Sequence, residues 1–312
     1  MSETYQCKSP VLFLVFNRPD VTARVFEVIR QAKPPRLYIA ADGPRPDREG
    51  EAEKCEEVRK IATAVDWDCD VEKLFRDENL GCGRAPSEAI SWFFENEPYG
   101  IILEDDCLPD PSFFKYCEWA LKTYSADRNV WHISGNNFLA PRRLFGGSAI
   151  SFVALPQVWG WATWWDRWEN YLYDACELSK IANKHSGEWQ LRRKSKHYKF
   201  EHIESLKRGL DTWDYQWQIV VLNHRGLAVV PSVNLITNLG VGSDATHTRS
   251  VNDWRLNMPA GKWTYTGSPI SPKLNKKLSV HFETNMGMPS ITQRVAAKLK
   301  YFLKKQGKKR QR

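Results

Sequence analysis

Strand-like and helix-like patterns alternate along the first hundred residues of the chain. Short apolar or alternating runs predict four buried strands, at 11–16, 37–41, 69–75 and 100–103. Helical patterns lie between these strands, at 21–32, 49–65 and 85–95, with a loop over 79–83. Alternating strands and helices imply right-handed crossovers, so we expect an α/β fold with a mostly parallel central sheet flanked by helices.

The second half is less regular. Helical patterns occur at 111–124, 188–207 and 213–224, and strand patterns occur at 130–134 and 227–230. Residues 238–248 are polar and rich in glycine, which predicts a mobile loop. We find no internal repeat and no linker between the two halves.

Positive charge is concentrated at the C-terminus. The chain has 312 residues and a net charge of +8, but residues 294–312 hold nine basic residues and no acidic one, so the rest carries −1. We therefore expect no nucleic-acid partner for the body. Residues 291–303 place Ile291, Val295 and Leu299 on one helical stripe edged by lysines, which predicts a helix lying on an anionic membrane surface. Alternatively, the stripe packs on the body and the end is solubilising.

Other features favour a cytoplasmic protein that is peripheral on the inner face of the membrane at most. The first ten residues are polar, and no run approaches the ~20 apolar residues that span a bilayer. The seven cysteines are odd in number and form no CxxC pair, which predicts reduced thiols.

Polar residues follow three of the predicted strands, where the carboxyl ends of parallel strands form ligand sites. They are Asn17-Arg18, Asp42 and Glu104-Asp105-Asp106. A guanidinium suits phosphate, and three consecutive acids repel one another unless a cation is present. A divalent ion held by one or two carboxylates and substrate phosphates would meet that need. Each signal alone is weak, but their order along the chain is informative.

Five of the 14 tryptophans lie within ten residues, at 159, 161, 164, 165 and 168. Aromatic faces often pack on sugars, so we expect one or two of the five, with Trp161 as the candidate, to contact a sugar. The alternative is a flat cluster in the core.

These segments resemble a known enzyme family. ILEDDCLPDPSFFKYC resembles the acidic-motif region of N-acetylglucosaminyltransferase I and of related bacterial, family-2-like GT-A sugar transferases. VLFLVFNRPD and LYIAADGP resemble the family's first two nucleotide-binding strands, and DRNVWHISGNNF resembles the strand after the metal motif. VWGWATWW and DTWDYQW resemble its acceptor-side elements. The resemblance spans roughly residues 10–248 and implies a GT-A (nucleotide-diphospho-sugar transferase) fold.

The resemblance also implies a domain plan. A catalytic domain would cover 1–285, with a nucleotide-binding half at about 10–135 and an acceptor half at about 136–285. Residues 286–312 would form the basic amphipathic tail, which has no counterpart in the Golgi enzymes of the family.

Site roles follow from the same resemblance. Asp106 would bind Mn²⁺ or Mg²⁺, and Glu104 and Asp105 would contact the sugar and ribose. Asp42 would contact the base, and Arg18, beside Asn17, the nucleotide or phosphates.

On the acceptor side, the resemblance implies that Asp214 is the catalytic base. Asp211 is close enough in the sequence to remain an alternative. His247 would approach the diphosphate when the glycine-rich loop closes.

The resulting expectation is an inverting, metal-dependent glycosyltransferase. It would move a sugar from a nucleoside-diphosphate sugar, with a UDP-sugar favoured by the resemblance, to a glycan or lipid-linked acceptor in bacterial surface glycan synthesis. A nucleotidyltransferase is one alternative, although the chain has no GxxxxGK[ST] or GxGxxG loop. A non-catalytic carbohydrate-binding protein is another, but it would leave the acidic triplet without a purpose.

Overall fold

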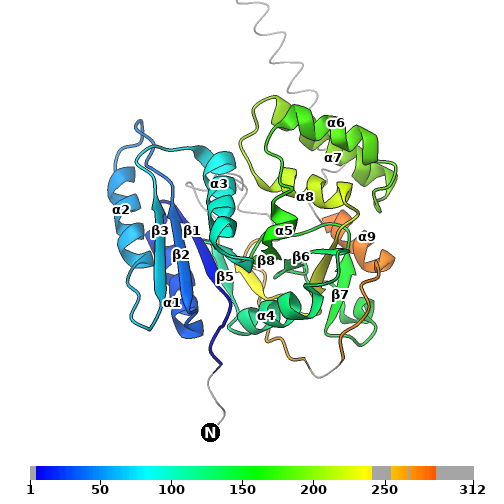
Figure 1. The fold of residues 1–312 in the computed structure, drawn as a ribbon, viewed down its shortest axis with the longest axis horizontal. Coiled ribbons are helices and arrows are strands. Elements are labelled where there is room, and N and C mark those ends of the chain that lie inside the picture. Colours follow the sequence, from blue (N-terminus) through cyan, green and yellow to red (C-terminus); the bar gives the residue numbers. More distant parts are fainter. Residues whose placement is uncertain (1–4, 241–253, 266–267, 286–312) are drawn as a thin grey trace, which may run out of the picture.

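The computed structural model describes residues 5–240, 254–265 and 268–285. Its centre is an eight-stranded mixed sheet in the order β3-β2-β1-β4-β8-β6-β9-β7, and β5 and β10 form a separate antiparallel pair (Figure 1). The strands are β1 Val11–Val15, β2 Arg36–Ala41, β3 Asp70–Phe75, β4 Tyr99–Glu104, β5 Cys107–Pro109, β6 Val130–Ser134, β7 Ile150–Val153, β8 Trp161–Trp164, β9 Leu227–Pro231 and β10 Ile236–Asn238.

Helices cover both faces of the sheet. They are α1 Pro19–Ala32, α2 Glu51–Ala62, α3 Gly81–Asn96, α4 Ser112–Tyr124, the 3₁₀ helix η1 Arg142–Phe145, α5 Trp165–Trp168, α6 Ala175–His185, α7 Arg193–Lys207, α8 Asp214–Asn223 and α9 Lys276–Asn285. One apolar core joins α1, α2 and α4 to one face of the sheet, and a second joins α3 and α6–α8 to the other face. The alternation of side chains along β1 explains this division, since Phe13 faces the first core and Leu12 faces the second.

The predicted α/β class with a mostly parallel central sheet flanked by helices is confirmed. Parallel pairing joins β1 to β2 and β4, β2 to β3, and β6 to β9. The sequence patterns did not reveal β7 and β8, which run antiparallel to their neighbours. Because β8 lies between β4 and β6, one continuous sheet runs through both predicted halves of the chain.

Two expected boundaries were wrong. The segment 79–83 was expected to be a loop, but α3 already begins at Gly81, because distant carboxylates accept hydrogen bonds from its first N–H groups. Residues 188–192 were expected to be helical, but α7 begins at Arg193.

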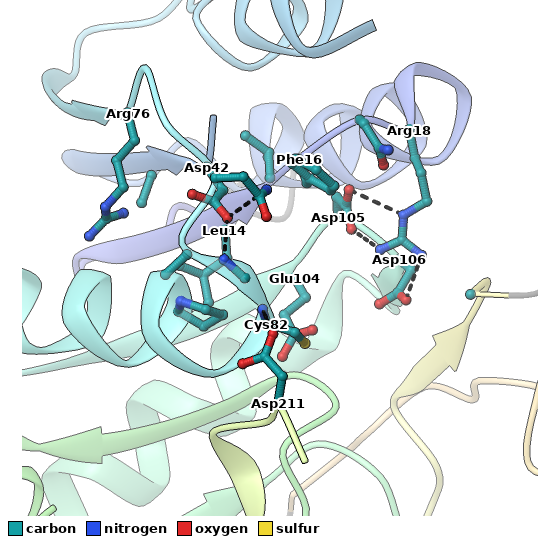
Figure 2. A pocket seen from close by; sticks show the side chains of 18 of the residues that line it. Leu14, Phe16, Arg18, Asp42, Arg76, Cys82, Glu104, Asp105, Asp106 and Asp211 are labelled. Carbon is teal, nitrogen blue, oxygen red and sulfur yellow. Dashed lines mark hydrogen bonds and ion pairs between the residues drawn. The ribbon is translucent and has the colours of Figure 1, made fainter. Parts of the chain in front are cut away.

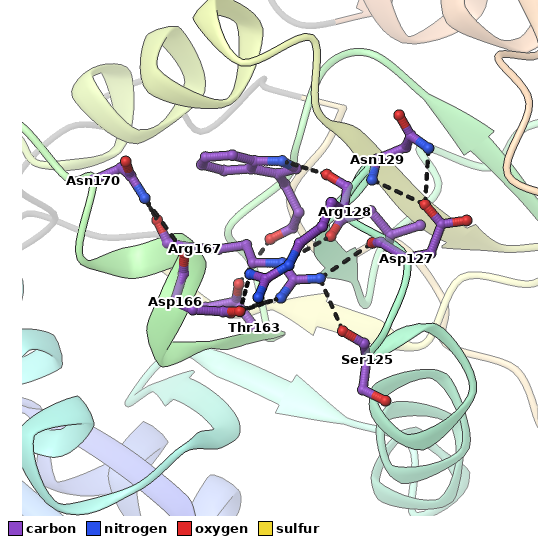
Figure 3. A network of polar contacts seen from close by, with 10 residues as sticks. Ser125, Asp127, Arg128, Asn129, Thr163, Asp166, Arg167 and Asn170 are labelled. Atoms are coloured by element: carbon purple, nitrogen blue, oxygen red, sulfur yellow. Dashed lines mark hydrogen bonds and ion pairs between the residues drawn. The ribbon is translucent and has the colours of Figure 1, made fainter.

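A buried arginine connects the β8–α5 junction to the loop before β6 (Figure 3). Arg167 is 2% exposed, and its guanidinium donates to the carbonyl oxygens of Val130 (3.2 Å), Ser125 and Asp127 (both 3.1 Å). It also pairs with Asp166 at 2.6 Å. These contacts satisfy a buried charge and fix the strand that separates β4 from β6.

Several predicted features lie outside the described residues, namely His247, most of the glycine-rich loop and the basic tail 286–312. Within the described part of the chain, no helix is both long and apolar enough to cross a membrane.

Candidate functional site

A cavity of about 330 Å³ lies at the carboxyl ends of β1, β2 and β4 (Figure 2). Parallel strands end at the same edge of a sheet, so the polar residues that follow them converge there. Seven of the residues predicted from the sequence line this cavity. They are Asn17, Arg18, Asp42, Glu104, Asp105, Asp106 and Asp211.

Arg18 supplies a positive charge to the acidic triplet. Its guanidinium forms ion pairs with Asp105 and with Asp106, the latter at 3.0 Å (Figure 2). The Asp105 side chain is only 4% exposed, and burial raises its pKa despite this guanidinium. Asp105 is therefore held by the protein itself, whereas the predicted contact with the sugar or ribose stays a prediction.

Glu104 carries the least compensated charge of the triplet. Its carboxylate makes no hydrogen bond and no ion pair with the residues that the structure describes, and burial, Asp106 and Asp105, in that order, raise its pKa to about 8. Without an added cation, the site therefore holds a proton on Glu104 near neutral pH.

The donor set fits a hard divalent cation. One arginine against three carboxylates leaves a deficit of two positive charges when all three acids are ionised. Asp106, 14% exposed, lies on the cavity wall with Glu104. No group of three or more His, Cys, Asp or Glu among the described residues is arranged to hold a metal ion. A site of this kind would therefore need further oxygen ligands from a substrate or water.

The segment after β10 packs against Asp106. Antiparallel pairing of β10 with β5 brings it there, and Leu239 N donates to the Asp106 carbonyl oxygen at 2.7 Å. A Cβ atom on Gly240 would lie 2.4 Å from Asp106 Oδ2. Glycine at 240 therefore permits this close approach, and Asn238 and Gly240 both line the cavity.

Asp42 lines the cavity, and its carboxylate also holds the neighbouring loop in place through hydrogen bonds. Its carboxylate accepts hydrogen bonds from the backbone N–H groups of Gly43, Leu80 and Gly81 and from Asn79 Nδ2, each at 3.0 Å. Burial raises its pKa, and these backbone hydrogen bonds oppose that effect. A nucleotide base that bound Asp42, as predicted, would have to share this carboxylate with the N–H groups of the loop.

Two further arginines line the same cavity. Asn17 Nδ2 donates to Glu51 Oε1 at 2.8 Å, and Glu51 in turn pairs with Arg45. Arg76 lies at the end of β3 and pairs with Glu88 at 3.3 Å. The cavity therefore combines acidic groups at the end of β4 with guanidinium groups that follow β1, β2 and β3.

The two candidate bases have different surroundings. Both oxygens of Asp211 accept hydrogen bonds at the N-terminus of α3, from Cys82 N and Gly83 N at 2.8 Å. Asp214 is the first residue of α8, and its Oδ1 accepts from Thr212 Oγ1. Within the described residues, its Oδ2 has no hydrogen-bond donor. Asp211 lines the cavity, and Asp214 lies close enough for its charge to act on Glu104.

The assignment of Trp161 to a sugar contact was wrong. Its side chain is 0% exposed and stacks between His132, at 4.9 Å between ring centroids, and Trp213, at 5.6 Å. The core alternative holds for Trp161, because both faces of the ring are covered. Of the five clustered tryptophans, Trp159 lines the cavity.

Sequence reasoning missed several cavity residues. Asn79 lies in a segment interpreted only as a loop, Arg45 and Arg76 lie just after the predicted second turn and third strand and were given no role, and Asn238 lies at the start of the expected glycine-rich loop. An arginine directly after the third strand is a signal that could have identified Arg76, by the same rule that was applied to Arg18.

No protein-family model and no curated protein sequence matches this chain. Among solved structures, apo UDP-glucose pyrophosphorylase has a TM-score of 0.35 and 9% identity over 72% of this chain and 90% of its own. The glycosyltransferase GlyE of Streptococcus pneumoniae TIGR4 has a TM-score of 0.30 and 10% identity over 67% of this chain and 45% of its own. The bifunctional glycosyltransferase WbbM has a TM-score of 0.35 and 9% identity over 72% and 39%.

Proposed function

We propose that this protein is an inverting, metal-dependent glycosyltransferase of the GT-A type. One observation carries the proposal: a single cavity at the carboxyl ends of parallel strands brings an incompletely compensated acidic triplet together with guanidinium groups. The guanidinium groups suit a diphosphate. A divalent cation, Mn²⁺ or Mg²⁺, held by Asp106 would neutralise charge on the departing nucleoside diphosphate. The donor that we favour is a UDP-sugar.

The transfer step also requires a residue of this chain to take the proton of the acceptor hydroxyl. The acceptor hydroxyl oxygen bonds to the anomeric carbon while the bond from that carbon to the diphosphate oxygen breaks, and the diphosphate leaves with the electron pair. Asp214 takes the hydroxyl proton, because its Oδ2 has no hydrogen-bond donor among the described residues. Asp211 is less suited, because both of its oxygens already accept from the first turn of α3.

The metal assignment can be tested by calorimetry. Titration of UDP in the presence and absence of Mn²⁺ should show metal-dependent binding to the wild-type protein and none to Asp106→Ala. Circular dichroism should show that the variant is folded, because one of three crowded acids has been removed. Equal metal-dependent affinity in both proteins would refute the assignment of Asp106.

The reaction can be tested with a panel of UDP- and GDP-sugars, screened first by thermal shift with Mn²⁺ and then for released products. Release of UDP supports transfer, whereas release of pyrophosphate would support a nucleotidyltransferase. Asp214→Asn should lower kcat by a factor on the order of 10²–10⁴ with little change in donor affinity. Near-normal turnover in this variant would exclude Asp214 as the base.

A further inference from the structure

A second cavity, of about 400 Å³, lies beside β7 and has no lining residue in common with the first. Strand β7 is the edge strand farthest from β3 (Figure 1). The cavity is formed mainly by the segments before β7 and after β9, by residues 262–265 and by Arg142. Its volume is within the range of small-molecule sites. We call it the β7 cavity, and the proposed transfer chemistry does not use it.

Both cavities lie toward the same edge of the sheet. Strand β9 is parallel to β6, and β6 and β4 are each antiparallel to β8, so β9 runs in the same direction as β4. Val233, after β9, lines the β7 cavity, and the chain continues through β10 to Asn238 in the first cavity. These two residues are about 18 Å apart at most, because they are five positions apart along the chain.

The charge balance of the β7 cavity is opposite to that of the first. Five carboxylate and three guanidinium side chains line the first cavity. Arg142 and Lys262 line the β7 cavity, and none of the described residues that line it is acidic. Neither side chain forms an ion pair or a hydrogen bond within the described part of the chain. The β7 cavity therefore presents two uncompensated positive charges, which suit an anion.

Hydroxyl side chains accompany the two cations. Ser148, Ser232 and Thr264 also line the β7 cavity, and each carries a hydroxyl group that can both donate and accept hydrogen bonds. Ser232 is held in place by its backbone, since its N–H donates to the Ala149 carbonyl oxygen at 2.9 Å. Such groups suit a ligand that carries hydroxyl groups as well as a negative charge.

An aromatic stack fixes one wall of the β7 cavity. Trp263 and Tyr265 line it, and their rings are stacked with 5.6 Å between centroids and 6° between planes. The Tyr265 ring also lies 4.5 Å from the Trp119 ring of α4, and Trp263 N donates to Ser112 Oγ at 2.8 Å. Because these contacts anchor the segment 262–265 to α4, a ligand would meet a wall that is already ordered.

We propose that the β7 cavity binds an anionic sugar, one that carries a phosphate or a carboxylate group. Arg142 and Lys262 contact the anion, and the hydroxyl side chains contact the sugar ring. The two cations call for an anion, whereas a sugar is the expected carrier of that anion because a sugar transfer is proposed at the same edge of the sheet. In naming a sugar, the inference rests on the proposed function.

Calorimetric titration of the full chain tests this site with four probes, which are glucose 6-phosphate, glucuronate, inorganic phosphate and glucose. The variant Arg142→Gln/Lys262→Gln removes both cations. The matched control is Arg143→Gln/Lys273→Gln, which removes the same two kinds of charge at exposed positions that do not line the cavity. Circular dichroism should show both variants folded, since all four side chains are exposed.

The wild type should bind at least one of the two anionic sugars more tightly than glucose, and the tighter of the two identifies the anion. Arg142→Gln/Lys262→Gln should lower that affinity about tenfold, because two charged contacts are lost. The control variant should keep the wild-type affinity. Higher ionic strength should weaken wild-type binding, because salt screens exposed charges.

The inference fails if the wild type binds neither anionic sugar, or if Arg142→Gln/Lys262→Gln binds as the wild type does. Equal losses in the control would attribute binding to net charge and would overturn it as well. Inorganic phosphate bound as tightly as glucose 6-phosphate, with no binding of glucuronate, would show that the cavity does not recognise a sugar. These titrations need no donor, metal or turnover, so their failure would leave the proposed function standing, and a lack of UDP release from every donor would refute the proposed function without altering them.

Discussion

Replacing Glu104 by glutamine tests the electrostatics of the cavity directly. Burial and the neighbouring Asp106 and Asp105 raise the pKa of Glu104 from its ordinary value of 4.5 to about 8 in the folded chain. The unfolded chain releases this proton near 4.5, so the folded chain holds one more proton between the two values. Glu104 therefore contributes stability that is fully present below pH 4.5 and is lost as the pH rises to about 8.

A difference of one bound proton changes the free energy of unfolding by about 1.4 kcal/mol per pH unit. Between pH 5 and 8, the metal-free wild type should lose up to that amount per unit relative to Glu104→Gln, which cannot titrate. Urea denaturation followed by tryptophan fluorescence, with EDTA present, measures both proteins at each pH. The difference between them cancels the titrating groups that do not interact with Glu104.

Glu95→Gln, which removes one carboxylate at an exposed position on α3, is the matched control. Adding Mn²⁺ at pH 8 should stabilise the wild type more than Glu104→Gln, because a nearby cation favours the ionised carboxylate. A wild-type-minus-variant difference that is constant from pH 5 to 8 would show that Glu104 ionises normally and would refute this account of the site.

Three other substitutions separate the roles of the surrounding residues. Asp42→Ala should lower the free energy of unfolding by about 1–3 kcal/mol in urea denaturation, because it leaves the donors at the cavity rim without their acceptor; unchanged stability would contradict this. Gly240→Ala should weaken Mn²⁺-dependent UDP binding in calorimetry with little change in thermal midpoint, because the new Cβ would lie 2.4 Å from Asp106 Oδ2; wild-type affinity would contradict it. Trp161→Ala should lower the free energy of unfolding by about 3–5 kcal/mol, since its ring is fully buried. A stable variant that has lost donor binding would instead support the contact between Trp161 and a sugar.

The first half of the fold could be predicted because short stretches of its sequence are enough to identify its strands. The buried strands of a parallel sheet are continuous apolar runs, and 11–16 and 37–41 show this in the sequence itself. Once such strands are assigned to a parallel sheet, their carboxyl ends must share one edge. Arg18, Asp42 and the acidic triplet could therefore be placed together although up to 88 residues separate them along the chain.

The rest depends on contacts that local patterns do not contain. Strand β8 is only four residues long and holds two tryptophans, and its place between β4 and β6 is set by pairing with both. Trp161 is buried because α8 brings Trp213 and Trp217 onto it from about fifty residues away. Similarly, the start of α3 depends on Asp211, which lies 129 residues beyond Cys82.

The acidic triplet shows where local reasoning needed correction. Three consecutive acids at a strand end do require positive charge, but the chain supplies part of it through Arg18, which belongs to the adjacent strand end and pairs with Asp105 and Asp106. An external cation is therefore not needed to hold all three carboxylates together. The negative charge that Arg18 does not compensate lies mainly at Glu104, where burial and the neighbouring carboxylates raise the pKa. The affinity of the site for a divalent ion should consequently depend on pH through the proton that Glu104 must release.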